Sequence, residues 1–378
     1  MAAHVIWDHL QDPPAVRATD VPWTAEAMTR DYLTAVLKRE HPGADVLDVA
    51  FEDGHAGSSV RRRLRLTWNA EGIAAGLPEF VFTKATPTLL TRLSSGMAAV
   101  AERRFYDRAR GEFEVEAPHL YHSAYDRDSG RSIHLFDDLV RTKGAHFCDY
   151  RVTLTREQLD DVVDLLAMVH GRFHASQRFA TDLAWVPTYE HFLLTGERNG
   201  IRIGHDRAMR EAADIIPARV VARRDEIWPR AVAHLAMHAR SPRTLIHSDV
   251  HLGNWYITGA GRMGLCDWAC VCSGHWARDL AYALSTTQTV AQRCTQEREL
   301  IARYLDALAS SGGPRVPFDE AFDDYRRQLF AALLMWTPTL CHPPTMPDMQ
   351  PPEMSRAMIE RMTTAIDDLD ALDAPEVA

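Results

Sequence analysis

The chain has 378 residues, of which 46% are hydrophobic and 25% charged, and its formal net charge is −10. This composition is that of a globular protein long enough for two lobes, and the acidic balance argues against a nucleic-acid partner. The six cysteines are too sparse for a disulfide scaffold, and no apolar run reaches the length of a membrane span. We therefore expect a cytoplasmic protein with free thiols and no membrane partner.

The first part of the chain is predicted to form a sheet-rich lobe. Residues 1–22 are rich in proline and polar residues and are expected to form an N-terminal arm. The first lobe then covers 23–139, and its first helix should run from Thr24, the N-cap, to about Arg39. Alternating and apolar runs predict strands at 45–51, 60–68, 79–84, 120–125 and 132–136, with a helix at about 97–109.

After the first lobe the pattern becomes helical, and residues 140–378 are expected to form the second lobe. Residues 155–176 place apolar side chains at helical spacing. Further helices are predicted at 207–239, 277–310, 317–335 and 352–371, with a proline-rich loop at 337–352. Strands are expected here only around the segment 245–268, so the fold class is α+β, with an antiparallel sheet lobe followed by a larger helical lobe.

The segment 245–268 carries the most informative motif. It contains His-x-Asp-x-x-x-x-Asn, with Asp249 and Asn254, and a second aspartate, Asp267, after a predicted hairpin. Phosphoryl transfer needs a carboxylate that orients the attacking hydroxyl and oxygen ligands that hold Mg²⁺ against the phosphates. We expect Asp249 to be the catalytic base and Asn254 and Asp267 to be the metal ligands. The alternative is that Asp249 and Asn254 merely form turns, which both residue types favour.

These loops resemble those of the aminoglycoside phosphotransferase/choline kinase superfamily. The resemblance rests on His-Ser-Asp-Val-His-Leu-Gly-Asn at 247–254 and Leu-Cys-Asp-Trp at 265–268. The C-terminal Met-Trp-Thr-Pro-Thr and Met-Gln-Pro-Pro-Glu segments are most similar to the bacterial ecdysteroid-kinase-like branch. The resemblance covers about 45–370 and implies a protein-kinase-like bilobal fold and an ATP-dependent small-molecule kinase.

The same resemblance implies residues that contact the nucleotide phosphates. Lys84 ends an apolar strand and is similar to the lysine that binds the α- and β-phosphates, while Glu102 on the next helix resembles its ion-pair partner. A surface lysine at a strand end is the alternative for Lys84. The turn that contains Gly54, Gly57, Ser58 and Ser59 could cover the phosphates with backbone amides, or it could be an ordinary hairpin turn.

Two further segments have counterparts in the family. His134–Leu139 resembles the hinge between the lobes, at about 135–140, where adenine would bond to the backbone of Asp137 and Leu139; the alternative is an edge strand that leads into a turn. Asp279, in Gly-His-Trp-Ala-Arg-Asp-Leu-Ala, is expected to accept backbone N–H groups and brace the loop that contains Asp249. His247 is expected to support this loop structurally.

Three other functions compete with a small-molecule kinase. In a metal hydrolase, His247, Asp249 and His251 would be metal ligands, but Asn254 and Asp267 would then have no role. A nucleotide-binding pseudokinase would lack a catalytic residue, whereas all the motif groups are present. A protein kinase needs an activation loop, and the short distance between Asp267 and Asp279 leaves no room for one.

We therefore predict an ATP-dependent O-phosphotransferase, with GTP as an alternative donor and Mg²⁺ as the cofactor. Its acceptor would be a hydroxylated small molecule bound by the helical lobe, and the enzyme would be a monomer or a homodimer. Segments 185–205, 275–290 and 330–350 are the candidates for the acceptor pocket. They contain large apolar side chains that could also be core residues, namely Trp185, Tyr189, Trp276, Met335 and Trp336.

Overall fold

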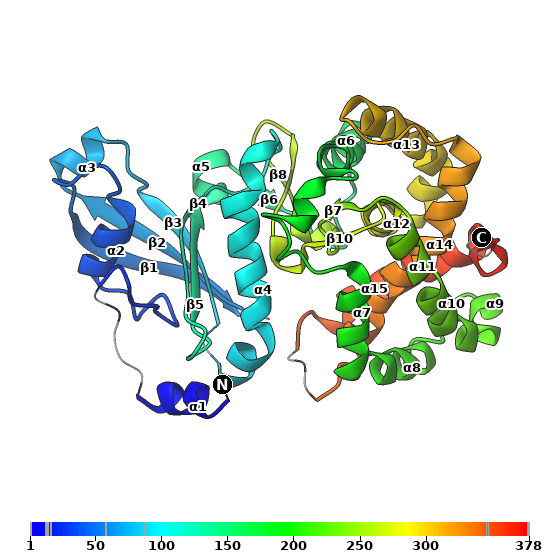
Figure 1. Ribbon diagram of the computed structural model, residues 1–378, viewed down its shortest axis with the longest axis horizontal. Coiled ribbons are helices and arrows are strands. Elements are labelled where there is room, and N and C mark those ends of the chain that lie inside the picture. Colours follow the sequence, from blue (N-terminus) through cyan, green and yellow to red (C-terminus); the bar gives the residue numbers. More distant parts are fainter. Residues whose placement is uncertain are drawn as a thin grey trace. The chain divides into compact units, whose positions relative to one another are not determined.

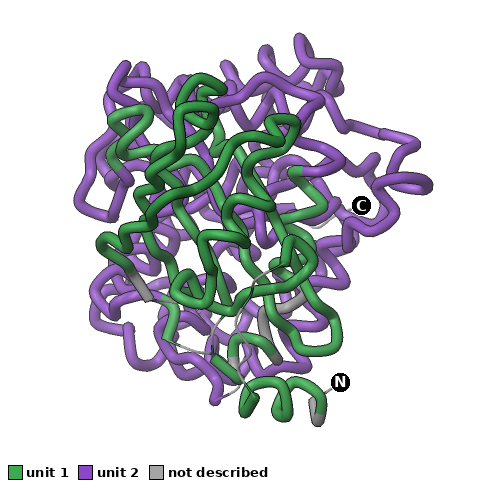
Figure 2. Tube along the Cα trace, turned by 90° about the vertical axis from the view of Figure 1, so that its left-hand side faces the viewer, with its two compact units in different colours: residues 1–106, 117–146, 346–349 green, residues 107–116, 147–345, 350–378 purple. Residues whose placement is uncertain are grey.

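The computed structural model shows a mixed helix and sheet protein (Figure 1). It describes residues 2–11, 15, 17–56, 59–86, 88–344, 346 and 348–375. The chain divides into two compact units, coloured green and purple in Figure 2. Unit 1 comprises residues 1–106, 117–146 and 346–349, and unit 2 comprises residues 107–116, 147–345 and 350–378. Each unit is described by itself.

Unit 1 is built on a five-stranded antiparallel sheet in the order β1-β2-β3-β5-β4 (Figure 1). Its strands are β1 (Val46–Ala56), β2 (Val60–Trp68), β3 (Phe80–Ala85), β4 (Leu120–Tyr125) and β5 (Ser132–Asp137). Alternate residues of β2 and β3 are buried, which is the two-residue period of a sheet that covers a core on one face. The inward side chains of Leu64, Val81 and Leu135 join Tyr32 and Leu33 in one apolar core.

The helices of unit 1 begin at different positions from those predicted. They are α1 (Ala2–Gln11), α2 (Arg30–Leu37), α3 (Ala70–Ala74), α4 (Leu89–Arg108, which ends in unit 2) and α5 (Leu139–Lys143). The predicted start at Thr24 was wrong because Thr29 is the N-cap of α2 and accepts the N–H of Tyr32. Thr24 instead accepts the N–H of Ala27 in a turn.

The predicted N-terminal arm contains a helix that is bound to the rest of unit 1. The Asp8 carboxylate on α1 accepts hydrogen bonds from Arg92 Nη1 at 2.8 Å and from Arg131 Nε at 2.6 Å. Both guanidinium groups are buried, so their charges need such a carboxylate. The prolines at 13, 14 and 22 led to the prediction of an arm, but residues 2–11 contain no proline or glycine and can form a helix.

Unit 2 is mainly helical. Its α-helices are α6 (Arg156–Phe173), α7 (Tyr189–Arg198), α8 (Ile201–Glu211), α9 (Ala218–Ala222), α10 (Ile227–Ala233), α11 (Leu235–Arg240), α12 (Ala277–Thr286), α13 (Val290–Ser310), α14 (Phe318–Leu340) and α15 (Pro352–Asp368). Its 3-10 helices are η1 (Arg110–Glu112), η2 (Gln177–Ala180), η3 (Arg224–Glu226), η4 (Leu252–Asn254), η5 (Trp268–Cys270) and η6 (Ala371–Asp373). The α+β prediction is confirmed by the antiparallel sheet of unit 1 and the helices of unit 2. None of the helices in the described ranges is long and apolar enough to cross a membrane.

Two long predicted helices are interrupted. The helix expected at 277–310 is α12 followed by α13, because Thr289 starts a new helix with a capping box that includes Gln292. The helix expected at 207–239 is divided into α8, η3 and α9–α11, and Pro217 stands at the N-cap of α9, where it has no N–H to continue a preceding helix. The predicted loop at 337–352 starts later, because α14 continues through Pro338 to Leu340.

The short strands of unit 2 surround the motif segment. They are β7 (Thr244–Ile246), β8 (Trp255–Ile257), β9 (Met263–Leu265) and β10 (Cys272–Gly274). β8 pairs with β9, as predicted, and β7 pairs with β10, which was not predicted because three residues are too few to show a two-residue period. A further strand, β6 (His146–Phe147), lies where the chain passes from unit 1 to unit 2.

Candidate active site

The loop 247–254 follows β7, and a residue in the first turn of α12, Asp279, binds its backbone. The buried Asp279 carboxylate accepts the backbone N–H of His247 at 2.6 Å and that of Ser248 at 3.0 Å. It also receives the Nε2 of His170 at 3.4 Å. Burial alone would raise the pKa of Asp279, but the His170 hydrogen bond and nearby positive charges lower it, so the carboxylate is ionised. Asp279 thus accepts two backbone N–H groups at the start of the loop, and its role in bracing the loop for catalysis stays a prediction.

The Asp249 side chain has a partner on each carboxylate oxygen. Asn254 Nδ2 donates to Oδ2 at 3.1 Å and to the Asp249 backbone oxygen at 2.7 Å. The Tyr282 hydroxyl on α12 donates to Oδ1 at 3.2 Å. His251 Nε2 lies 3.7 Å from Oδ2. Asp249 retains 23% of its side-chain exposure, so this carboxylate is both fixed in direction and accessible.

His247 connects the Asp249 loop with the segment that contains Asp267. Its Nδ1 accepts the N–H of Asp249 at 3.2 Å, and its Nε2 donates to the carbonyl oxygen of Cys266 at 3.0 Å. Complete burial lowers the pKa of His247, which agrees with a neutral ring that accepts on one nitrogen and donates on the other. The two hydrogen bonds agree with a structural role for His247, which stays a prediction.

Asp267 follows β9 in a left-handed backbone conformation, with φ of 64°. Few residues other than glycine adopt this conformation, and aspartate is among those that tolerate it. The backbone N–H of Cys266 donates to the carbonyl oxygen of Asn254 at 3.0 Å, so Asn254 is bonded directly to the residue that precedes Asp267. The segments with Asn254 and Asp267 are therefore held in one place within unit 2.

The donor set suits a hard cation better than zinc. The Asn254 amide donates through Nδ2 to the backbone oxygen and to Oδ2 of Asp249, which directs its carbonyl oxygen Oδ1 to a cation. Oxygen donors from Asn254 and Asp267 are the type that Mg²⁺ prefers. In contrast, within the described ranges no three His, Cys, Asp or Glu side chains are grouped to hold a metal, and both ring nitrogens of His247 have internal partners. This arrangement disfavours the metal-hydrolase alternative.

In unit 1, Lys84 and Glu102 form the ion pair that was expected. The Nζ of Lys84 on β3 lies 2.7 Å from Oε2 of Glu102 on α4. Their side chains are 14% and 2% exposed, and His134 Nε2 lies 3.9 Å from the same carboxylate oxygen. Because Glu102 is buried, its charge needs Lys84, and the flexible lysine stem is held in one direction.

The predicted glycine turn is shorter than expected. Gly54 lies within β1, opposite Arg62, where a Cβ atom would come within 2.5 Å of the Arg62 side chain. Gly54 is therefore required by the close approach of the two strands, and its placement in a turn was wrong. Ser59 is buried next to the start of β2. Gly57 and Ser58 lie outside the described residues, so a contact of this turn with phosphate stays a prediction.

The predicted hinge residues lie at the end of β5, which includes Asp137, and directly after it. The Asp137 N–H donates to the carbonyl oxygen of His119 at 3.0 Å, and its carboxylate accepts the His119 N–H at 2.7 Å. Asp138 is the N-cap of α5, and Leu139 is the first residue of that helix. Since the Asp137 N–H is already bonded, the predicted adenine contact at this residue would have to use another group. Both adenine contacts stay predictions.

The large apolar residues proposed for the acceptor pocket have different surroundings. Tyr189 and Trp276 are buried core residues that contact the rings of His238 and Tyr304, respectively. Trp336 is also buried, but its ring centroid lies 5.0 Å from that of His251, beside the Asp249 loop. Trp185 and Met335 are partly buried. Trp336 is thus the one of these five that is placed next to the motif.

Sequence reasoning missed two residues of α12, Arg278 and Tyr282. Tyr282 hydrogen-bonds to Asp249, and Arg278 Nη2 donates to the carbonyl oxygen of Ser248 at 3.3 Å. A weak signal was available: they flank Asp279 at positions that are one helical turn apart, on the same helix face. Arg278 lies in a helix whose other residues are mostly small or apolar, and this composition indicates that the arginine is buried.

The sequence matches the model of the phosphotransferase enzyme family over residues 55–317, which is more than half of the chain. The chain belongs to this phosphotransferase family. It is accordingly an enzyme, a phosphotransferase. The resemblance to the wider superfamily is thereby confirmed, while the finer similarity to ecdysteroid-kinase-like proteins stays a prediction.

Solved structures with similar chains include several phosphotransferases. A GDP complex of an aminoglycoside 2'-phosphotransferase has 11% identity and a TM-score of 0.49, with 89% of this chain and 99% of that chain covered. The ethanolamine kinase of Plasmodium vivax has 11% identity and a TM-score of 0.49, with 84% and 81% covered. A macrolide 2'-phosphotransferase from Brachybacterium faecium has 15% identity and a TM-score of 0.45, with 90% and 97% covered. No curated protein matches this phosphotransferase.

Proposed function

We propose that this phosphotransferase moves the γ-phosphoryl group of ATP or GTP to a hydroxyl of a small molecule, with Asp249 as the catalytic base. The observation that carries the proposal is the Asp249 carboxylate itself. It is partly exposed, and Asn254 and Tyr282 bond to its two oxygens from different sides. A group fixed in this way can hold an attacking hydroxyl in line without having to reorganise during the reaction.

Asp249 orients the acceptor hydroxyl and takes up its proton. Each carboxylate oxygen can accept more than one hydrogen bond, so the bonds from Asn254 and Tyr282 leave room for the acceptor. As the new bond forms between the acceptor oxygen and the γ-phosphorus, the bond from that phosphorus to the nucleoside diphosphate breaks. The acceptor proton passes to Asp249.

Asn254 and Asp267 would hold Mg²⁺ through Oδ1 and a carboxylate oxygen. Bound there, the ion supplies positive charge that offsets the charge on the phosphate oxygens. The neutral His247 ring links Asp249 to Cys266, the residue before Asp267, and therefore keeps the base and the cation ligands in register. The Asp279 brace holds the start of the same loop.

Lys84 would neutralise phosphate charge on the nucleotide. Glu102 keeps the Lys84 ammonium group in one direction through the 2.7 Å ion pair. A lysine held by a buried carboxylate can bind phosphate with less loss of side-chain freedom than a free surface lysine. The proposed donor is ATP or GTP. The proposed acceptor is a hydroxylated small molecule, and the residues that line the acceptor pocket determine its chemical class. A cytoplasmic location and a monomer or homodimer stay predictions.

The test is nucleotide consumption with a library of hydroxylated small molecules, Mg²⁺ and either ATP or GTP. The wild type is compared with Asp249→Asn and with Asp206→Asn, an exposed carboxylate on α8. We expect acceptor-dependent diphosphate release that Asp206→Asn retains and Asp249→Asn loses by at least roughly 1,000-fold in kcat. Full turnover in Asp249→Asn would contradict the role of Asp249. Nucleotide binding by the wild type without turnover on any acceptor would favour the pseudokinase alternative.

A further inference from the structure

Two residues of α12 contact the loop 247–254 at the residue before Asp249 and at Asp249 itself. Arg278 reaches the backbone of Ser248, and Tyr282 reaches the Asp249 carboxylate. They are four residues apart in one helix, so they lie on the same face. Neither contact belongs to the Asp279 brace, which is made through backbone N–H groups only.

Ser248 needs contacts on both sides because its backbone is in the left-handed region, with φ of 67°. This conformation is unfavourable for a residue with a side chain, and it persists only where neighbouring groups impose it. Asp279 accepts the Ser248 N–H at 3.0 Å, and Arg278 donates to the Ser248 carbonyl oxygen at 3.3 Å. Two consecutive residues of α12 therefore hold both polar backbone groups of Ser248.

Arg278 is a fully buried cation with aromatic rings on two sides. Its Cζ lies 5.1 Å from the ring centroid of Tyr189 and 4.7 Å from that of Tyr282. No residue in the described part of the chain accepts a hydrogen bond from its Nε or Nη1. This buried guanidinium depends for its stabilisation on the two ring faces, on its polar contact with Tyr189 and on the charge of Asp279. The Tyr282 ring is consequently fixed by the cation that lies over it.

The hydroxyl of this fixed ring donates to Asp249 Oδ1 at 3.2 Å. Burial, together with the neighbouring Asp249 charge, raises the pKa of Tyr282 well above its usual value, so the hydroxyl stays a donor throughout the physiological range. The chain of contacts runs from the Arg278 cation to the Tyr282 ring and from the Tyr282 hydroxyl to the carboxylate.

We propose that Arg278 and Tyr282 are positioning residues that fix the direction of the Asp249 carboxylate toward the acceptor hydroxyl. Arg278 acts on the backbone of Ser248 and on the Tyr282 ring, and Tyr282 acts on Oδ1. The catalytic consequence rests on the proposed function of Asp249, whereas the effect on the loop does not. Both residues act on Ser248 and Asp249, so the effect should appear in the transfer step and not in nucleotide binding.

The proposal is tested with three variants of buried tyrosines. Tyr282→Phe removes the hydroxyl but keeps the ring under Arg278, and Tyr282→Leu removes both. The control is Tyr325→Phe, because Tyr325 is equally buried and its hydroxyl donates to Glu297 at 3.4 Å, away from the loop. Each full-length variant is assayed for kcat, for the KM of the nucleotide and for hydrogen–deuterium exchange of peptides that cover 247–256.

We expect kcat to fall roughly tenfold in Tyr282→Phe and roughly 100-fold in Tyr282→Leu, with the nucleotide KM within about twofold of the wild type. Exchange in 247–256 should rise in both, and more in Tyr282→Leu, because only that variant releases Arg278. Tyr325→Phe should match the wild type in kcat and in exchange of this loop.

Three outcomes would overturn the proposal. They are a wild-type kcat together with unchanged exchange in Tyr282→Phe, an equal loss in Tyr325→Phe, and a loss that appears in the nucleotide KM instead of kcat. If the wild type transfers phosphate to no acceptor, the proposed function fails separately. The exchange of 247–256 then still decides whether Tyr282 and Arg278 hold the loop.

Discussion

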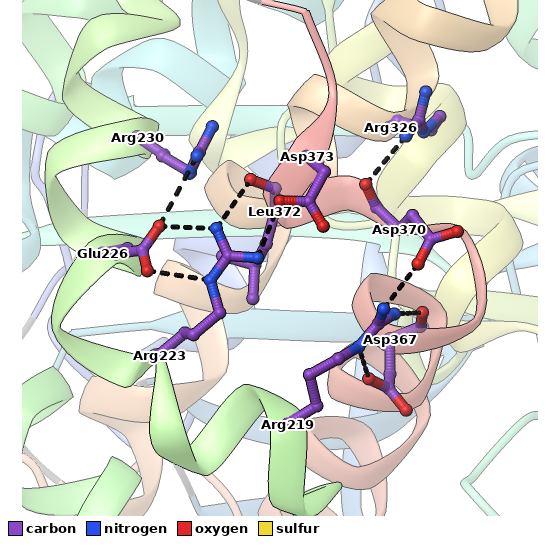
Figure 3. A network of polar contacts seen from close by, with 9 residues as sticks. All are labelled: Arg219, Arg223, Glu226, Arg230, Arg326, Asp367, Asp370, Leu372 and Asp373. Carbon is purple, nitrogen blue, oxygen red and sulfur yellow. Dashed lines mark hydrogen bonds and ion pairs between the residues drawn. The ribbon is translucent and has the colours of Figure 1, made fainter.

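The loop 247–254 and the C-terminal polar network of unit 2 are both held by arginines and carboxylates, but the contacts of the loop are buried and those of the network are exposed. Figure 3 shows the network. In the network, Arg219 of α9 bonds to Asp367 and Asp370. Arg223, the residue after α9, bonds to Asp373 and to the backbone oxygen of Leu372. The Asp279 side chain that braces the loop is 0% exposed, whereas Arg219 and Asp370 in the network are 47% and 60% exposed.

This difference decides what each group of contacts contributes. Water cannot replace a lost partner in a buried site, so removing one group leaves the others unsatisfied. At an exposed site, water and salt compete with each ion pair, and the net contribution of a pair is small even where many pairs are visible. The loop should therefore fail when one residue is changed, and the network should weaken gradually.

The largest effect is expected from Asp279→Ala. It leaves the backbone N–H groups of His247 and Ser248 without their acceptor in a buried place. We expect the free energy of unfolding, measured with urea, to fall by about 3 kcal/mol. Asp373→Ala, in the exposed network, is the matched control and should leave the free energy of unfolding unchanged within error. Equal changes in the two variants would show that burial does not distinguish the two regions.

The core of unit 2 should also be more sensitive to acid than the network. Burial lowers the pKa of His205 to about 4, and it lowers the pKa values of His238 and His275 to about 3. An unfolded histidine titrates near 6.5, so the unfolded chain binds more protons than the folded one below that pH. Stability is therefore lost as the pH falls from about 6.5 toward 4, by about 1.4 kcal/mol per pH unit for each such histidine.

Urea unfolding at a series of pH values between 7.5 and 5 measures this slope. A His205→Gln variant should show a slope that is smaller by about one proton. Asp370→Asn should follow the wild-type profile, since Asp370 is exposed and is not one of the buried histidines that cause the slope. A free energy of unfolding that is constant from pH 7 to 5 would contradict the prediction.

The solvent exposure of the Lys84–Glu102 pair lies between those of the two regions, because Glu102 is buried and Lys84 is partly exposed. Glu102→Gln keeps the size of the side chain but removes the charge that orients Lys84. Loss of one charge-assisted hydrogen bond, about 1.5 kcal/mol, corresponds to roughly tenfold in affinity. We expect the Kd for nucleotide, measured by calorimetry, to rise by about that factor. Glu112→Gln, which removes an exposed carboxylate of unit 2 paired with Arg172, is the control and should leave the Kd unchanged.

The sequence predicted those parts of the molecule that local patterns determine. The strands of unit 1 alternate in hydrophobicity, and their ranges were close to the observed β1–β5. His247, Asp249, Asn254 and Asp267 lie in two short segments joined by a hairpin, so spacing alone brought them together. Local signals also mark the two helix breaks, namely the capping box at Thr289 and the helix-breaking Pro217. The predicted helices at 277–310 and 207–239 nevertheless ran across them.

Other contacts depend on the tertiary structure and leave no mark in spacing. Tyr282 is distant from Asp249 in sequence, and only the pairing of β7 with β10 places α12 beneath the loop. The composition of α12 indicates that Arg278 is buried, but its place between two aromatic rings could not be inferred. The Asp8 contact of α1 with Arg92 and Arg131 is likewise set by packing.

The smallest effect is expected from Arg223→Gln in the network. Hydrogen bonds from Arg223 lower the pKa values of Glu226 and Asp373, although slight desolvation opposes this. A carboxylate with a lowered folded pKa stabilises the fold above its ordinary pKa, and this stabilisation is lost as the pH falls through the lowered value. The network should therefore hold the segment 367–373 at neutral pH and release it only below about pH 4.

NMR titration of the Asp373 carboxyl, with selectively labelled aspartate, measures this directly. In Arg223→Gln the pKa of Asp373 should return to about 3.9, the ordinary aspartate value, while the melting temperature changes little. In the wild type, 1 M NaCl should move the same pKa in the same direction, because exposed pairs are screened. A large drop in melting temperature would instead mean that this exposed network stabilises the fold as strongly as the buried contacts of the loop 247–254.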